Sequence, residues 1–353
     1  MNCQQINKWR MICSVIGKSA PHPSDRRLRA LIALIGIMIC SIAWRGQSAG
    51  TTSASLILQW THQSQFAGYY VALEKGFYLK RGLNVEILRG GPDRNPADYL
   101  PDNRAQFMTT FLTGALVHRD KGAALVNIAQ IVNRSTLMLI AWKNRGIKSA
   151  ADLQGRRVSL WGGDFRAPFL GFFKANSIEP VIIPQNYTTN LFLRGGADAC
   201  AAMYYNEYDT IRQSGVNEDE ITTFFMRDHG FDLPEDGIYC LESMTRSHPD
   251  ACAAMAAASM EGWRHALDHR DEALDITMKY VNESNLPTNR THMKWMLDKI
   301  LEAIFPRAGD DWQAGVITAR AYDKAAALLK QQGLVGTVAP YERFRWQGGA
   351  NAQ

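Results

Sequence analysis

The chain has 353 residues, of which 46% are hydrophobic and 21% are charged, an ordinary composition for one large or two medium globular domains. Its formal net charge of +5 is concentrated at the start. The first 49 residues carry seven Lys/Arg and one acidic residue, and the rest of the chain carries 32 basic and 33 acidic residues. The body therefore lacks the excess positive charge that binds nucleic-acid phosphates, so we expect no nucleic-acid partner.

The N-terminal segment has the features of an export signal. An unbroken apolar run of 14 residues, Leu31–Trp44, follows Arg26 and Arg27. The run is shorter than the roughly 20 residues of a membrane-spanning helix and is typical of a secretory signal. Cleavage is expected near Ala49, and the paired arginines loosely resemble a twin-arginine signal. We assign residues 1–49 to a signal peptide, with an uncleaved N-terminal anchor as the alternative, and expect a periplasmic body.

Three cysteines remain in the body. Cys200, Cys240 and Cys252 form no CxxC motif and no cluster with histidines of the kind that binds zinc. We therefore expect buried single thiols and no metal site, although an exported chain could pair two of the three.

Strand and helix patterns alternate through the first half of the body, which predicts a parallel sheet covered by helices. The expected strands are 56–58, 84–88, 105–109, 125–131 and 137–142, and the expected helices are 69–75, one from about 97, and 115–121.

A second α/β unit follows, and a helical segment ends the chain. The expected strands are 157–161, 181–184, 199–204, 221–226 and 237–241, and the expected helices are 169–175, 190–194, 251–268, 271–281, 293–304 and 316–332. The strand at 237–241 is expected to return to the first half. We predict lobe 1 from residues 50–142 and 237–353, lobe 2 from residues 143–236, and a ligand cleft between them.

The stretch after the first strand is the leading candidate for a ligand site. Ligands of open α/β sheets bind beyond the carboxyl ends of the strands, where Gln59 and Trp60 lie. Trp60 and either Tyr69 or Tyr70 could stack on a flat ring, while Gln59 and Gln65 supply hydrogen bonds. The alternative is that these aromatic residues are ordinary core residues, and at least one of the tyrosines is expected to pack inward.

Two further candidates lie in the second unit. Gly162, Gly163 and Asp164 follow a strand and precede a helix, so their amides could hold an anion or polar group, although a tight turn explains them equally well. Tyr205 and Glu207 end another strand, where the carboxylate could accept hydrogen bonds from a heterocycle. The alternative for Glu207 is an exposed residue at a helix start.

Motifs for common chemistries are missing from the sequence. There is no P-loop, HExxH or GxSxG. His62, His118 and His229 are scattered, show no nucleophile–base pairing, and are expected to be structural or solvated. We therefore expect no catalytic residues and no cofactor.

Several segments resemble the periplasmic substrate-binding proteins of the SsuA/THI5-like (NMT1/THI5) family. They span about residues 55 to 280 in the order found in that family. The segments are Gln59-Trp60, Gln65–Ala72, Lys75–Tyr78, Gly82–Val85, Val126–Ile131, Gly146–Ser149, Asp152–Gly155, Val158–Gly163 and Tyr205–Tyr208.

The resemblance implies a type II periplasmic-binding-protein fold whose two lobes close on a ligand, and delivery to the membrane subunits of an ABC importer. Members of this family bind thiamine pyrimidine precursors, other small heterocycles or sulfonates. Gln59-Trp60 match the polar–Trp pair that contacts the pyrimidine, Gly162-Gly163 match the loop at its polar end, and Glu207 matches the acidic position facing the ring. The expected ligand is a small aromatic heterocycle, specifically a thiamine pyrimidine precursor of the hydroxymethylpyrimidine type, with a sulfonate as an alternative.

One branch of the family is an enzyme, the thiamine pyrimidine synthase, which uses a lysine-bound pyridoxal phosphate, a histidine and a CCCFC motif. The lysine position is Thr110 here, the histidine position is Gly114, and Cys200 stands alone. The resemblance therefore favours a binding protein over this enzyme. An anchored sensor domain is the remaining alternative, and no signalling segment follows the helical segment.

Overall fold

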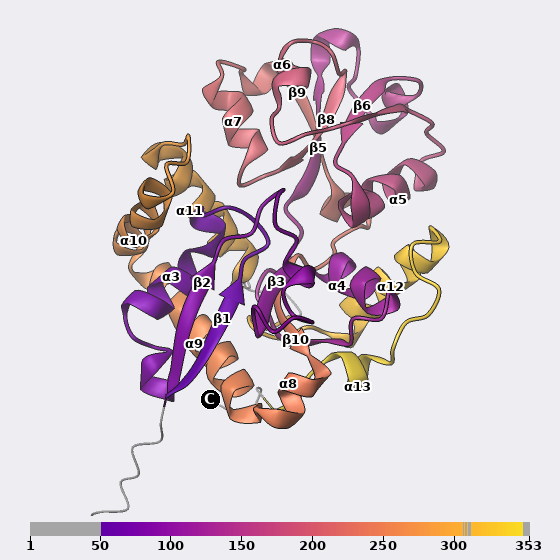
Figure 1. Cartoon of the computed structure of the whole chain (residues 1–353). Coiled ribbons are helices and arrows are strands. Elements are labelled where there is room, and N and C mark those ends of the chain that lie inside the picture. Colours follow the sequence, from indigo (N-terminus) through magenta and orange to yellow (C-terminus); the bar gives the residue numbers. More distant parts are fainter. Residues whose placement is uncertain (1–50, 306, 308, 310–311, 349–353) are drawn as a thin grey trace, which may run out of the picture. The chain divides into compact units, whose positions relative to one another are not determined.

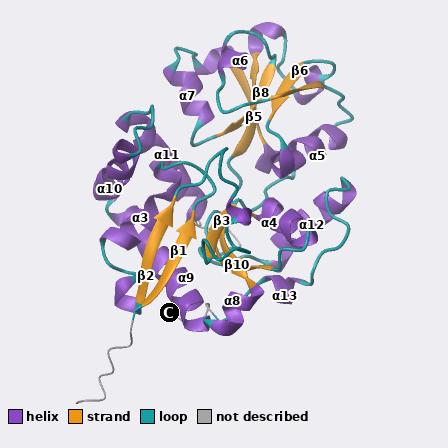
Figure 2. Cartoon of the chain, viewed as in Figure 1, coloured by secondary structure: helices purple, strands orange, loops and turns teal. Residues whose placement is uncertain are grey.

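The computed structural model describes residues 51–305, 307, 309 and 312–348, except for the side chain of Asp164. The predicted leader at 1–49 lies outside the described residues. Within the described residues, no helix is long and apolar enough to span a membrane. They form two five-stranded sheets (Figure 1), and helices pack around both sheets (Figure 2).

The first sheet has the strand order β2-β1-β3-β10-β4. Strand β1 is parallel to β2 and β3, whereas β10 runs antiparallel to both β3 and β4. Its strands are β1 (Thr52–Ile57), β2 (Leu83–Leu88), β3 (Phe107–Phe111), β4 (Leu125–Gln130) and β10 (Asp236–Leu241). We call this sheet and the helices packed on it lobe 1.

The second sheet repeats this order as β7-β6-β8-β5-β9. Here β5 is the inserted strand, antiparallel to β8 and β9. Its strands are β5 (Leu137–Trp142), β6 (Arg157–Leu160), β7 (Val181–Pro184), β8 (Ala199–Met203) and β9 (Ile221–Phe225). We call this sheet and its helices lobe 2. The expected boundary of lobe 1 at residue 142 is therefore wrong, because β5 already belongs to the lobe 2 sheet, and β10 of lobe 1 begins at Asp236 rather than at residue 237. The expectation of purely parallel sheets is wrong for one strand in each lobe, because that strand enters from the other lobe and runs in the opposite direction.

Two segments cross between the lobes, one before β5 and one before β10, and backbone hydrogen bonds join them. Val132 N–H donates to the Asp236 carbonyl at 2.9 Å, and Glu235 N–H donates to the Val132 carbonyl at 2.9 Å. The buried Gln130 side chain donates from Nε2 to the carbonyls of Val132, Glu235 and Asp236, at 2.9 to 3.1 Å. The crossing segments therefore form a paired hinge whose buried backbone groups are satisfied.

Helices cover both sheets, and those after β10 contact both lobes. Trp295 in α11 donates from Nε1 to the Tyr204 carbonyl of lobe 2 at 3.1 Å, and Gln332 beside α12 donates to the Ala167 carbonyl at 2.7 Å. The helices are α3 (Ala67–Glu74), α4 (Leu112–Asp120), α5 (Ala167–Ala175), α6 (Asn190–Leu193), α7 (Glu207–Gln213), α8 (Glu242–Ser247), α9 (Pro249–Asp268), α10 (Arg270–Glu283), α11 (Arg290–Ile304), α12 (Ala319–Gln331) and α13 (Tyr341–Phe344).

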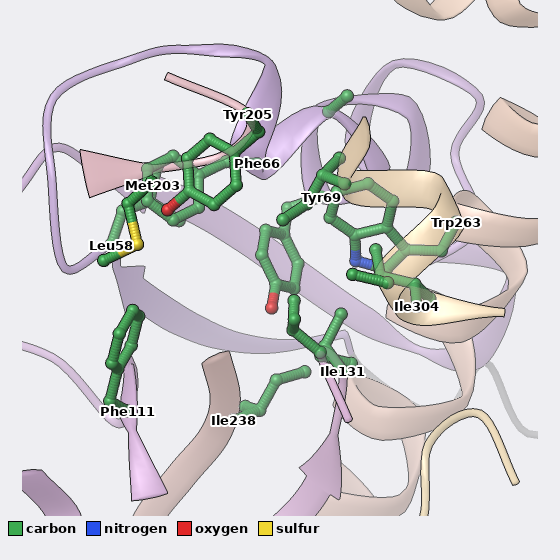
Figure 3. Close-up of a cluster of buried hydrophobic side chains, with 14 of the residues drawn as sticks. Leu58, Phe66, Tyr69, Phe111, Ile131, Met203, Tyr205, Ile238, Trp263 and Ile304 are labelled. Atoms are coloured by element: carbon green, nitrogen blue, oxygen red, sulfur yellow. The ribbon is translucent and has the colours of Figure 1, made fainter. Parts of the chain in front are cut away.

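Small residues allow α3 and α9 to pack very closely. A Cβ atom at Gly262 would lie 2.1 Å from the Gly68 carbonyl oxygen, and one at Gly68 would lie 2.2 Å from the Trp263 ring. Trp263 is fully buried and meets the Tyr69 ring edge-on at 5.8 Å. This contact fixes the helix that follows the candidate ligand stretch (Figure 3).

Some expected element boundaries are wrong. The helix expected from about 97 is a single 3₁₀ turn, Pro96–Asp98, and β3 lies two residues later than expected. Strand β1 begins at Thr52, because backbone pairing with β2 extends the short apolar run into the polar Thr/Ser segment. Tertiary pairing thus overrides the local composition.

Candidate functional site

Two glutamines of the predicted site converge on one buried carboxyl group. Gln59 follows β1, Gln65 lies in the 3₁₀ turn Ser64–Phe66, and both side-chain amides donate to Asp236. Gln65 Nε2 lies 2.6 Å from Asp236 Oδ2, and Gln59 Nε2 bonds Oδ1. Gln63 donates in turn to Gln65 Oε1 at 2.5 Å. The network holds the ends of β1 and β10 together at one edge of the lobe 1 sheet.

The network leaves one acceptor unused. Gln59 Oε1 is buried and has no hydrogen-bond partner among the described residues. Because Asp236 fixes the amide nitrogen of Gln59, the free oxygen has a defined direction. A buried acceptor without a partner is costly, so a ligand N–H group at this position would be stabilised.

Asp236 has no cation paired with it in the hydrogen-bonding network. It is only 2% exposed, and burial raises the pKa of its carboxyl to about 8, opposed by the hydrogen bonds from Gln65 and Gln59. The neighbouring Glu235 charge raises it further. The Asp236 carboxyl therefore gains or loses its proton at a pH slightly above neutral.

Glu235 joins the two crossing segments. Its carboxyl accepts hydrogen bonds from the Thr136 amide at 2.5 Å, the Thr136 hydroxyl at 2.7 Å and the Ser135 hydroxyl at 3.1 Å. Burial raises the pKa of Glu235 to about 7, although these donors oppose the shift. Glu235 thus binds the two crossing segments to each other. The adjacent Asp236 binds two glutamines of the candidate ligand stretch.

An aromatic pair spans the lobes beside Gln59. Trp60 is half-buried, and its ring centroid lies 5.5 Å from that of Tyr187, with the planes tilted by 49°. Tyr187 lies in the loop after β7 of lobe 2 and is 61% exposed. A flat ring stacked between them needs about 7 Å, twice a normal carbon contact distance. A ligand would therefore enter this position only after the lobes separate.

Both candidate tyrosines of α3 pack inward. Tyr69 is 1% exposed and lies against Trp263, while Tyr70 stacks on Tyr280 with ring centroids 4.3 Å apart. The expectation that at least one of them packs inward is confirmed. The Tyr69 hydroxyl has no hydrogen-bond partner among the described residues.

Tyr205 and Met203 bring lobe 2 into contact with lobe 1. They belong to the same buried cluster as Leu58, Phe66 and Phe111 (Figure 3). Burial raises the pKa of the Tyr205 phenol, and the nearby Asp236 carboxyl raises it further. Tyr205 therefore lies near the glutamine network, and its role in ligand binding stays a prediction.

Glu207 is the first residue of α7 and is half-buried. One carboxyl oxygen accepts from the Met203 amide at 2.8 Å, and the other accepts from Asn206 Nδ2 at 2.9 Å. Burial raises the pKa of Glu207 to about 7 against these two hydrogen bonds. Both of its oxygens thus have partners within the chain, and Glu207 lies at a helix start but is half-buried rather than exposed. Its role as an acceptor for a heterocycle stays a prediction.

A polar bridge next to Glu207 joins α11 to lobe 2. His292 Nδ1 lies 2.8 Å from Asp209 Oδ2, and His292 Nε2 lies 3.0 Å from Asn206 Oδ1. His292 and Asp209 are both buried. The two contacts therefore tie α11 to the first turn of α7.

The glycine loop of lobe 2 is open to solvent. Gly162 and Gly163 are exposed, and no atom lies within 4 Å of a Cβ placed at either residue. Gly163 has a φ of +69°, a left-handed conformation that favours glycine. The Asp164 side chain lies outside the described residues. The loop therefore leaves room for a ligand but does not distinguish an anion site from a tight turn.

The structure brings Gln59, Gln65 and Tyr205 to the Asp236 network and places Trp60 beside it.

Sequence reasoning missed Asp236 and Tyr187. The adjacent acids Glu235 and Asp236 at the start of a buried strand were a usable signal, and Tyr187 follows a strand end, the same position that singled out Trp60. No group of three metal-binding side chains occurs among the described residues.

The shared strand order, the inserted antiparallel strands and the paired hinge define a type II periplasmic-binding-protein fold. The model of the family described as NMT1/THI5 like matches residues 63–273, and this chain belongs to that family. The predicted fold and family are thereby confirmed.

Individual proteins similar to this chain show how far the likeness extends. The riboflavin-binding protein RibY of Chloroflexus aurantiacus is 24% identical over 66% of this chain and 67% of its own length. The formylaminopyrimidine-binding protein of Halalkalibacterium halodurans is 21% identical over 85% of this chain and 94% of its own length. The aliphatic sulphonate-binding protein SsuA of Escherichia coli has a similar structure, with a TM-score of 0.65 and 14% identity over 84% of this chain and 92% of that one.

Proposed function

We propose that this protein is the solute-binding component of an ABC importer and that it binds a small aromatic heterocycle. The observation that carries the proposal is the juxtaposition of Trp60 and Tyr187, one from each lobe, next to the unpartnered acceptor Gln59 Oε1. Two aromatic faces and a directed acceptor suit a flat ring that carries an N–H or amino group.

The relatives support this ligand class. The names of two of them, a riboflavin-binding and a formylaminopyrimidine-binding protein, both specify molecules that contain a pyrimidine ring. We propose a thiamine pyrimidine precursor of the hydroxymethylpyrimidine type as the specific ligand. The predicted leader and the fold support a periplasmic location and delivery to ABC transporter membrane subunits.

Six residues have distinct roles in this proposal, and Glu207 stays a candidate acceptor for hydrogen-bond donors of the ring. Trp60 and Tyr187 stack on the two faces of the ring as the lobes close, and Gln59 accepts a hydrogen bond from its edge. Gln65 orients the network through Asp236. The exposed amides of Gly162 and Gly163 bind a polar substituent of the ligand.

A binding screen with purified protein tests the proposal. Hydroxymethylpyrimidine, formylaminopyrimidine, riboflavin and an alkanesulfonate are compared by thermal shift and by calorimetry. We expect one of the heterocycles to bind and to raise the melting temperature. Trp60→Ala should weaken that binding by roughly fivefold or more, since loss of an aromatic side chain stacked on a heterocycle costs about 1–3 kcal/mol.

Trp142→Phe is the matched control. Trp142 is half-buried at the end of β5 and stacks on Phe192 within lobe 2, away from Trp60. The control should leave ligand affinity unchanged. Binding of the sulfonate alone, unaffected by Trp60→Ala, would overturn the heterocycle proposal and favour the sulfonate alternative.

The synthase alternative requires an amine that this chain does not place at the expected position. Thr110 lies in β3, and Gly114 is buried in α4. We propose that the protein is not an enzyme of this type. Incubation with pyridoxal phosphate and borohydride, followed by mass spectrometry, should show no specific lysine adduct, and a stoichiometric adduct at one lysine would revive the enzyme.

A further inference from the structure

Two buried thiols lie side by side in lobe 1. Cys240 is in β10, Cys252 is in α9, and their sulfur atoms are 3.9 Å apart. Both residues are 0% exposed, whereas the third described cysteine, Cys200, lies in β8 of lobe 2. All three are free and buried, as the sequence predicted, but two of them form a pair.

We propose that Cys240 and Cys252 form a structural disulfide bond. The two sulfur atoms are close to van der Waals contact, and a bond needs them at about 2 Å, a change that rotation of two cysteine side chains can supply. The residues are separated along the chain by α8 and its flanking turns, so the link closes a short loop between strand and helix. Disulfides of this kind persist in oxidising compartments, and formation in the cell therefore rests on the proposed export.

The chemistry is thiol–disulfide exchange with a small-molecule or protein disulfide. The thiolate of one cysteine attacks the oxidant's disulfide, which expels one thiolate and forms a mixed disulfide. The second cysteine then attacks the protein sulfur of that mixed disulfide and expels the other thiolate. The two cysteines lose two electrons, the oxidant is reduced to two thiols, and those thiols take up the two protons.

Burial determines when this exchange occurs. The neighbouring Cys252 thiol and burial both raise the pKa of the Cys240 thiol, so little thiolate exists in the folded state. The sulfur atoms are also inaccessible to an oxidant. The bond therefore forms while the chain folds, before α9 covers β10, and is then protected from reduction.

The bond would tie together two elements that position the candidate site. Strand β10 begins at Asp236, which binds Gln59 and Gln65, and α9 carries Trp263, which packs on α3. The redox state of the two cysteines should therefore change the stability of lobe 1 without direct contact between the disulfide bond and the ligand. The proposal can fail or hold independently of the proposed function.

Peptide mapping tests the proposal directly. Purified full-length chain is unfolded, reduced and refolded with reduced and oxidised glutathione, then alkylated and digested with trypsin. Cleavage at Arg227, Arg246 and Arg264 releases Cys240 in peptide 228–246 and Cys252 in peptide 247–264. We expect these two peptides to be linked, to separate on reduction, and to leave Cys200 alkylated in peptide 195–212.

Thermal unfolding provides a second readout. Oxidised protein should melt roughly 5 °C higher than reduced protein, as expected for a short disulfide loop in a chain of this size. Cys252→Ala should abolish this redox-dependent difference, and the matched control Cys200→Ala should retain it. Separate alkylated peptides after oxidative refolding, or a link to Cys200, would overturn the proposal.

Discussion

The two lobes have the same strand order but present very different surfaces to the proposed ligand. In lobe 1, the Gln59, Gln65 and Asp236 side chains form a largely buried hydrogen-bonded network. In lobe 2, Tyr187 is 61% exposed and Gly162 has open space around it. The comparison suggests that lobe 1 is organised before binding, whereas lobe 2 contributes mainly by approaching the bound ring. Preorganisation of one surface reduces the entropy lost on binding.

Removal of the Asp236 carboxyl should have the largest effect on this asymmetry. Asp236→Ala leaves the amide donors of Gln59 and Gln65 without their acceptor in a buried site. We expect a loss in the free energy of unfolding on the order of 3 kcal/mol, measured by urea titration. Asp236→Asn keeps an acceptor and should lose less.

Tyr187→Ala is the comparison from lobe 2. Its exposed ring should contribute no more than about 0.5 kcal/mol to stability. Equal destabilisation by Asp236→Ala and Tyr187→Ala would contradict the view that lobe 1 is the organised one.

The stability of lobe 1 should fall as pH rises. The pKa of Asp236 is about 8 in the folded protein, above its ordinary value of 3.8, and that of Glu235 is about 7 rather than 4.5. Their contribution is therefore complete below about pH 4 and is lost as pH rises towards 8. We expect the free energy of unfolding, measured by urea titration, to be lower at pH 8.5 than at pH 5.

Asp236→Asn separates the two acids. It removes one titrating group, so the fall measured by urea titration should be smaller than in the wild type. If the free energy of unfolding of this variant fell as much as in the wild type, or more, the pH dependence would come from other groups such as Glu207 in lobe 2.

The bridge between α11 and α7 should contribute a smaller effect. His292→Ala removes the hydrogen bonds to Asp209 and Asn206 and should cost about 1–2 kcal/mol. Amide hydrogen exchange should accelerate in α7 in particular. His248→Ala is the control, since the exposed His248 side chain bonds only the neighbouring Ser247 among the described residues. Unchanged exchange in α7 would show that the bridge does not restrain lobe 2.

The smallest expected effect is the loss of ligand affinity when the aromatic ring of lobe 2 is removed. Tyr187→Ala should weaken heterocycle binding about threefold to tenfold, measured by calorimetry, because it removes one exposed stacking face. Tyr187→Phe keeps the ring and should bind normally. If Tyr187→Ala weakened binding more than Trp60→Ala, lobe 2 would be the dominant surface and the asymmetry would be reversed.

Much of the fold could be predicted from local patterns. The apolar runs of β4, β5 and β8 and the helical repeats of α9 to α12 appear in the sequence at nearly the observed positions. The inserted strands could not be recognised as antiparallel, because strand direction depends on which lobe the chain comes from. The α7 helix was missed because its seven residues carry too few apolar positions for a clear pattern.

In the candidate site, too, local sequence predicted some residues, and only folding determined the others. Trp60 and Gln59 were identified because they follow a strand end, and Tyr187 follows a strand end as well but belongs to a short, exposed segment. Asp236 is separated from Gln59 by 177 residues, so only folding brings it to the network. Tyr69 and Tyr70 looked equally suited to stacking, and their burial against Trp263 and Tyr280 depends on helices far along the chain.

The sequence by itself determined the alternation of strands and helices, the family and the residue types that suit an aromatic ligand. The alternation and the residue types can be read because hydrophobic periodicity and strand-end positions are local properties. The family was expected from the resemblance of its motifs. Only the tertiary structure decided which tyrosines are buried, which carboxyl holds the glutamines, and which cysteines lie together. These depend on distances between segments more than one hundred residues apart, or on how a strand and a helix pack. No local pattern records such distances.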